Sequence, residues 1–133
     1  MGPARLKYLE MIQAVVTRMA TNQFTTRAWS VTLGTAVVGW AVAKSDHPEH
    51  AIVAVLPTFC FWILDAFYLS HERSFRCLFN RQCQIVDEPA SLSLETTWKP
   101  LDWIGALFSP AVTLVHGSVL LAAWLVWRGK WPL

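Results

Sequence analysis

Three stretches of the chain are apolar enough to be interpreted as membrane-spanning helices. They cover residues 28–43, extendable back through Arg27 to Phe24, residues 51–70, and residues 103–127. A helix needs about 20 mostly apolar residues to cross the hydrocarbon core of a bilayer. The first stretch reaches this length only if Arg27 extends its charged end to the headgroups. The pattern therefore predicts an all-α integral membrane protein with about three transmembrane helices.

Pro110 divides the third stretch, because proline cannot continue a helix from the residues before it. We expect residues 101–109 to lie in the membrane interface and residues 110–127 to cross. The predicted spans are thus 24–43, 51–70 and 110–127. A re-entrant third segment, which would return the C-terminus to the starting side, remains an alternative.

The polar segments around these spans are short. Residues 1–23 predict an amphipathic helix that lies either on the inner leaflet or against partner helices of an oligomer. The second span is expected to continue as a cytoplasmic helix to residue 82, followed by a loop over 83–100. The apolar positions of the first helix recur at three- and four-residue steps: Leu6, Leu9, Ile12, Val15, Val16 and Met19.

Composition supports a membrane location. Of the 133 residues, 54% are hydrophobic and only 15% charged, with a mean hydropathy of +0.36. Soluble domains carry about 25% charged residues. The length fits one membrane domain over 1–133 and leaves no room for a separate catalytic domain.

Positive charge is distributed unevenly about the expected spans. With the N-terminus inside, the inner segments hold eight lysines and arginines, and the outer segments hold Lys44, Arg128 and Lys130. Positive residues favour the cytoplasmic side, so we expect a cytoplasmic N-terminus and an external C-terminus. The eight are Arg5, Lys7, Arg18, Arg27, Arg73, Arg76, Arg81 and Lys99.

Few residues suggest bond-making chemistry. Cys60, Cys77 and Cys83 form no C-x-x-C motif, and Pro48 interrupts a small cluster of histidines and acids at 46–50. We find no phosphate-binding glycine loop, nucleophile elbow or zinc-protease motif. The sequence therefore predicts no enzyme, no cofactor and no metal site.

Two polar residues within the predicted spans carry the functional argument. Asp65 lies near the inner end of the second span, where it could pair with Arg27, meet water, or form part of a pore or gate. His116 lies mid-span beside Thr113 and Ser118. Its imidazole could hydrogen-bond a neighbouring helix, or these three side chains could line a pore.

Small residues at four-residue spacing favour close helix packing. Examples are Ser30 and Gly34, and Gly39 and Ala43, in the first span. Three short spans cannot enclose an aqueous path within one chain. A channel would therefore require a homo-oligomer.

Two segments resemble the Hailong-type channel effectors, a family of small bacterial membrane proteins encoded beside anti-phage defence genes. The first comprises residues 8–22, which begin Tyr8-Leu9-Glu10-Met11, followed by residues 29–33. The second comprises residues 61–79, which include Leu64-Asp65-Ala66-Phe67. A broader likeness is to SLATT-type two-helix effectors, which lack the third span. The resemblance implies a tetrameric channel that depolarises the membrane of an infected cell. It also implies gating by oligodeoxyadenylate from a partner nucleotidyltransferase, and a location in the bacterial inner membrane.

An oligonucleotide ligand would need cations for its phosphates and aromatic faces for its bases. Phe75, Phe79 and Trp98 are possible stacking surfaces, and no binding of duplex nucleic acid is expected. The alternative is that the cations contact anionic lipid and set the topology. The candidate ligand-binding cations are Arg73, Arg76, Arg81, Lys99, Arg18 and Lys7.

Overall fold

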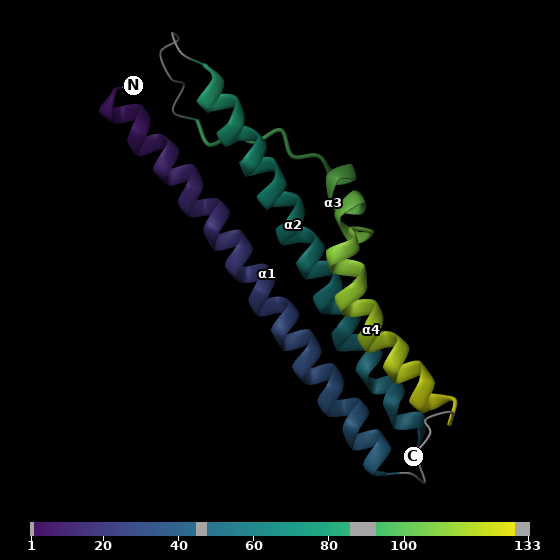
Figure 1. The fold of residues 1–133 in the computed structure, drawn as a ribbon. Coiled ribbons are helices and arrows are strands. Elements are labelled where there is room, and N and C mark those ends of the chain that lie inside the picture. The colour runs from purple at the N-terminus through teal and green to yellow at the C-terminus, as the bar shows by residue number, and fades with distance from the viewer. Residues whose placement is uncertain (1, 45–47, 86–92, 130–133) are drawn as a thin grey trace.

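Two long antiparallel helices form the frame of the molecule (Figure 1). The computed structural model describes residues 2–44, 48–85 and 93–129, and these ranges are helical apart from their connections. The all-α expectation is confirmed for them. The elements are α1 (Pro3–Ala43), the 3₁₀ helix η1 (Pro48–Ala54), α2 (Val55–Gln84), α3 (Pro100–Leu107) and α4 (Pro110–Trp127).

Helix α1 is a single helix of 41 residues, which joins the two segments expected at 1–23 and 24–43. Pro3 occupies its first turn, where a missing N–H costs nothing, and no proline follows before residue 44. The apolar pattern changes near residue 23, but nothing in the backbone chemistry breaks the helix there. The boundary expected between residues 23 and 24 is therefore not a break in the helix. It marks the place where the packing partners of α1 change.

The first half of α1 packs against the second half of α2. Tyr8, Ile12 and Val16 are buried together, and Phe75 and Phe79 are among the α2 side chains packed against them. We call residues 3–26 of α1 with residues 67–84 of α2 the two-helix arm. The N-terminal segment thus packs against a helix of the same chain. The sequence alone predicts a position either on the inner leaflet or against helices of other subunits.

Helix α4 joins the other half of the hairpin, where it contacts α1, α2 and η1. Gly34 of α1 makes this packing possible, because a Cβ at residue 34 would lie 2.3 Å from Cγ1 of Val119. Ala41, Ala51 and Val126 are buried together nearer the far end. We call residues 27–43 of α1, 48–66 and 110–127 the three-helix end.

The break before Pro110 is confirmed. Helix α3 ends at Leu107, and α4 begins at Pro110 after Ser109, whose extended backbone (φ −62°, ψ 135°) redirects the chain. A proline at the first helical position suits a helix start. The predicted limits of the third span, 110–127, coincide with α4. Residues 93–99 return along the two-helix arm, where the Tyr8 hydroxyl donates to the Ser93 carbonyl.

Two helical segments are long and apolar enough to cross a membrane: Glu49–Gln84 and Pro110–Trp127. Within their most apolar windows only 22% and 28% of the residues are buried, whereas a core helix of a soluble protein is mostly buried. Leu56 and Leu114 are 72% and 73% exposed. Apolar surface on this scale is typical of a membrane or partner contact.

Helix α1 is not among these candidate spans, although its length is ample. Arg27 and the surrounding threonines interrupt its apolar run. Two of the three expected spans therefore satisfy the criteria of length and apolarity, and the crossing of residues 24–43 remains a prediction.

Candidate functional site

A row of polar side chains runs between the helices, from the three-helix end into the two-helix arm. The α1 members are spaced four and three residues apart, and the α2 members seven and four apart, so each set lies on one face of its helix. We call this row the polar chain. Its members are Gln23, Arg27 and Ser30 of α1, Asp65, Glu72 and Arg76 of α2, and His116 of α4.

Asp65 is the centre of the polar chain. Arg27 Nε donates to its Oδ2 over 2.7 Å, and His116 Nε2 lies 3.2 Å from the same oxygen. Asp65 is completely buried, and its Oδ1 has no hydrogen-bond partner in the described part of the chain. The pairing with Arg27 that the sequence suggested is confirmed. A buried carboxylate with a cation beside it avoids most of the cost of an unpaired charge.

His116 connects α4 to both long helices. Its Nδ1 lies 2.8 Å from the Ser30 hydroxyl, while its Nε2 faces Asp65. A neutral ring with its proton on Nε2 satisfies both contacts, because Nδ1 can then accept from Ser30. The expected hydrogen bond from His116 to a neighbouring helix is confirmed.

Trp62 holds the imidazole of His116 in place. The two rings are stacked, with centroids 6.1 Å apart and planes 15° apart. Trp62 Nε1 donates to the Leu107 carbonyl over 2.9 Å, and Leu107 is the last residue of α3. The polar chain is therefore tied to the break between α3 and α4.

Toward the two-helix arm the polar chain continues through Gln23 and Glu72. Arg27 donates from its terminal nitrogen to Gln23 Oε1 over 3.3 Å, and Gln23 Nε2 donates to Glu72 Oε2. Arg76 Nε donates to Glu72 Oε1 over 2.6 Å. Glu72 is 8% exposed, whereas the Arg76 side chain is 62% exposed. The polar chain thus runs from a buried ionic centre to an exposed arginine.

The four expected pore residues do not share one surface. Asp65 and His116 are fully buried inside a single chain. Thr113 is half-buried and donates to the Leu107 carbonyl over 3.3 Å, whereas Ser118 is exposed and donates to the Val115 carbonyl over 2.8 Å. Of these four, only Ser118 is exposed on the chain without any rearrangement.

The expected ligand-binding cations also separate. Arg73 and Arg81 line two grooves beside the returning segment and share the neighbours Ser74, Cys77 and Thr97. Arg73 donates to the Ser109 hydroxyl over 3.2 Å. Arg76 lies in a different groove, against α1.

The remaining three cations lie apart from these arginines. Lys7 is paired with Glu10 at 4.0 Å on an exposed turn. Arg18 is exposed on α1, and Lys99 precedes α3, where its backbone N–H donates to Asp102. The six cations therefore do not form one continuous patch on a single chain.

The aromatic side chains proposed for base stacking are partly engaged. Phe75 and Phe79 pack against the buried cluster of the two-helix arm. Trp98 stacks on His71 with ring centroids 4.9 Å apart and donates to the Ser70 hydroxyl over 3.1 Å. Phe79 also lines the groove that holds Arg76, which makes it the candidate placed beside a cation.

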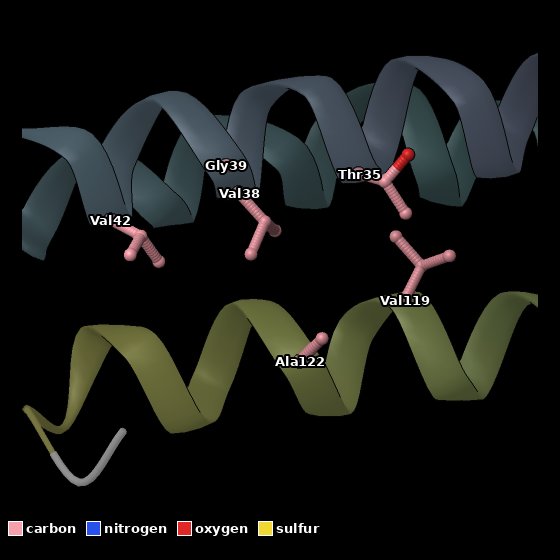
Figure 2. A pocket seen from close by; sticks show the side chains of 6 residues that line it. All are labelled: Thr35, Val38, Gly39, Val42, Val119 and Ala122. Carbon is pink, nitrogen blue, oxygen red and sulfur yellow. The ribbon is translucent and has the colours of Figure 1, made fainter. Parts of the chain in front are cut away.

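An apolar groove lies between α1 and α4 at the three-helix end (Figure 2). Thr35 donates its hydroxyl proton to its own helix, at the Val31 carbonyl over 2.6 Å. Figure 2 shows the hydroxyl pointing away from α4. The groove therefore presents an almost wholly apolar lining. It is lined by Thr35, Val38, Gly39, Val42, Val119 and Ala122.

Metal and thiol chemistry add little to this site. The described residues contain no group of three or more histidine, cysteine or acidic side chains that could hold a metal ion. Asp46 and His47 of the cluster noted from sequence lie outside the described residues. Cys60, Cys77 and Cys83 are free and exposed.

Comparison of the chain with protein-family models, curated proteins and solved structures finds no match.

Proposed function

We propose that the chain is one subunit of a homo-oligomeric ion channel that acts as an anti-phage defence effector in the bacterial inner membrane. The observation that carries the proposal is the buried ionic centre on an apolar helix, where Asp65 meets Arg27 and His116. Ionisable residues within a membrane span are costly and rare, and they commonly mark ion pathways or gates.

The small number of helices supports a channel built from several subunits. Glu49–Gln84 and Pro110–Trp127 satisfy the criteria for a span, and even with α1 a single chain offers three helices. Such a bundle fills its interior with side chains, as the burial of Asp65 and His116 illustrates. An aqueous path would therefore lie between copies, and the resemblance to Hailong-type effectors favours a tetramer. Ser118, exposed on α4, is the most accessible of the candidate pore residues.

The proposed gate responds to a nucleotide or oligodeoxyadenylate ligand made by a partner nucleotidyltransferase. The N-terminus and the two-helix arm are cytoplasmic in this arrangement. The exposed arginines of α2 are available to phosphate groups. A ligand can change the conducting fraction only by binding the closed and open states unequally. The broken helix pair α3 and α4, tied to Trp62 and His116, is the element whose rearrangement would expose the ionic centre.

Ion flux from liposomes tests this function. The purified full-length protein is reconstituted with a trapped fluorescent reporter of K⁺ or H⁺ flux, and leak is measured with and without oligodeoxyadenylate. We expect protein-dependent flux that the oligonucleotide changes. Asp65→Asn, a variant similar in volume, is expected to alter the flux. Absence of flux under both conditions would overturn the channel proposal.

A non-conducting structural or partner-binding subunit is the second candidate. The complete burial of Asp65 and His116 favours it, because their polar contacts could serve only to hold three helices together. In that case the liposomes stay tight, and Asp65→Asn changes stability without any change in permeability.

A further inference from the structure

A small groove on the two-helix arm combines one exposed guanidinium with two amides. It has a volume of about 220 Å³ and lies between α1 and α2. The side chains that line it are Gln13, Val16, Arg76, Phe79 and Asn80. Arg76 is therefore the only charged residue that lines this described groove, and Glu72 beside it balances part of its charge.

The chemistry of the lining suits a phosphate group. In the described structure, the hydrogen bond of Arg76 is made by Nε to Glu72, which leaves the terminal nitrogens of its planar fork for a second acceptor. Arginine binds phosphate through such paired N–H donors. The side-chain amides of Gln13 and Asn80 can donate to further oxygens, and Phe79 offers the edge or face of a ring.

We propose that this groove binds a phosphate-bearing anion and that the polar chain transmits its occupancy to Asp65 and His116. The inference rests on the proposed function, for which it names a ligand site and a route of regulation. The phosphate could belong to a soluble nucleotide or to a lipid headgroup.

Competition for Arg76 is the first step of the transmission. A phosphate bound by the terminal nitrogens pulls the guanidinium into the groove and so weakens the bond from Arg76 Nε to Glu72 Oε1, which is 2.6 Å long without it. Glu72 is almost fully buried, so water can replace little of this contact. Its other oxygen accepts from Gln23, and Gln23 in turn accepts from Arg27. A carboxylate that has lost one cation is therefore drawn toward the next.

The second step is a change at the ionic centre. Arg27 is shared between Gln23 and Asp65, so a movement of Arg27 toward Glu72 weakens its 2.7 Å contact with Asp65 Oδ2. Asp65 then depends more strongly on His116 Nε2. Coupling of this kind is reciprocal: a change at His116 must also alter the affinity of the groove for its anion.

Binding is tested by calorimetric titration of the full-length protein in a maltoside detergent, which carries no phosphate of its own. The probes are inorganic pyrophosphate and hexameric oligodeoxyadenylate. We expect Arg76→Ala to weaken binding about tenfold or more, since a charge-assisted pair is lost. Arg128→Ala removes an equal charge at the opposite end of the bundle and should leave the affinity unchanged. No binding of either probe, or equal binding by Arg76→Ala, would overturn the site.

The source of the phosphate is distinguished in a third arm. The protein is reconstituted into nanodiscs of neutral lipid or of lipid containing phosphatidylglycerol, and oligodeoxyadenylate is titrated into each. If the ligand is soluble, the wild type should bind oligodeoxyadenylate with the same affinity in both kinds of nanodisc, once the effect of membrane surface charge has been subtracted. The Arg76→Ala variant, titrated in the same two nanodiscs, measures that effect. A lipid headgroup predicts that phosphatidylglycerol blocks the titration at Arg76.

Transmission is tested by the ¹⁵N chemical shifts of the His116 imidazole, assigned with His116→Gln. We expect pyrophosphate to shift these signals in the wild type but not in Arg76→Ala. Gln23→Leu should still bind the probe and lose the shift, because the bridge to Arg27 is gone. An unchanged His116 signal on binding, or a shift that persists in Gln23→Leu, would overturn the transmission. Neither result depends on ion flux, so this test can fail while the channel proposal stands.

Discussion

Arg27 of α1 donates through Nε to Oδ2 of Asp65 on α2, over 2.7 Å, across the interface of the two longest helices. The carboxylate is fully buried, whereas the arginine side chain keeps 27% of its surface exposed. The ion pair is therefore accessible to solvent only through Arg27. The same oxygen of Asp65 contacts His116 of α4. This one oxygen connects all three helices of the three-helix end.

Removing the cation alone should destabilise the protein strongly. In Arg27→Ala the buried Asp65 loses its charged partner, and we expect the free energy of unfolding to fall by about 3 kcal/mol. The double variant Arg27→Met, Asp65→Leu replaces the pair with apolar groups and should lose much less than the sum of its single variants. Unfolding in mixed micelles of maltoside and SDS measures these energies. Strictly additive losses would contradict the pairing.

The closest approach of α1 and α4 gives a second prediction. A methyl group at Gly34 would overlap Val119, so Gly34→Ala should destabilise the fold by about 1–3 kcal/mol through overpacking. Val119→Ala in the same chain should recover most of this loss. Gly39→Ala is the matched control, because a Cβ there meets nothing within 4 Å. Thermal unfolding in detergent compares the variants, and equal stability of Gly34→Ala and Gly39→Ala would rule out the contact.

His116 should act through hydrogen bonds as well as through packing. His116→Phe keeps a ring against Trp62 but removes the imidazole contacts of Ser30 and Asp65, and leaves Asp65 with Arg27 alone, at a cost of about 1–3 kcal/mol. Ser30→Ala removes a single contact and should cost about 1 kcal/mol. Both changes are measured as losses in the free energy of unfolding. If His116→Phe matches the wild type, the ring serves for packing alone.

The cysteines report the position of the bilayer. Cys60, Cys77 and Cys83 are all exposed on the single chain, so protection of one of them from a thiol reagent must come from lipid or from another subunit. We expect single-cysteine variants in inverted inner-membrane vesicles to react rapidly with a membrane-impermeant maleimide at Cys77 and Cys83, and slowly at Cys60. All three should react after SDS is added. Rapid labelling of Cys60 in intact vesicles would contradict a span over 51–70.

Several features of the fold could be predicted because strong local signals carry them. Pro110 marks the start of α4, whose limits match the predicted span 110–127. The pairing of Asp65 with Arg27 could be anticipated, since a lone acid in an apolar helix needs a nearby cation. The continuity of α1 could not be predicted. The apolar pattern changes near residue 23 because the helix has different neighbours on either side of that residue, and such a change looks the same in sequence as the end of a helix.

The rest of the polar chain escaped prediction for a different reason. Gln23 and Glu72 are ordinary polar residues in polar segments, where sequence favours solvent exposure. The available signal was their spacing: Gln23 lies four residues before Arg27, and Glu72 lies seven residues after Asp65. These spacings place Gln23 on the same face of α1 as Arg27, and Glu72 on the same face of α2 as Asp65. Which face of α1 meets which face of α2 is decided by tertiary packing. For the same reason, Arg76 could not be distinguished from Arg73 and Arg81.

Conductance of the purified full-length protein in a planar lipid bilayer tests the channel proposal most directly. An oligomeric channel predicts discrete current steps in the wild type, smaller steps in Ser118→Trp, and an open fraction that changes when oligodeoxyadenylate is added on the side of the two-helix arm. An electrically silent bilayer that contains correctly folded protein, with and without the oligonucleotide, would contradict it.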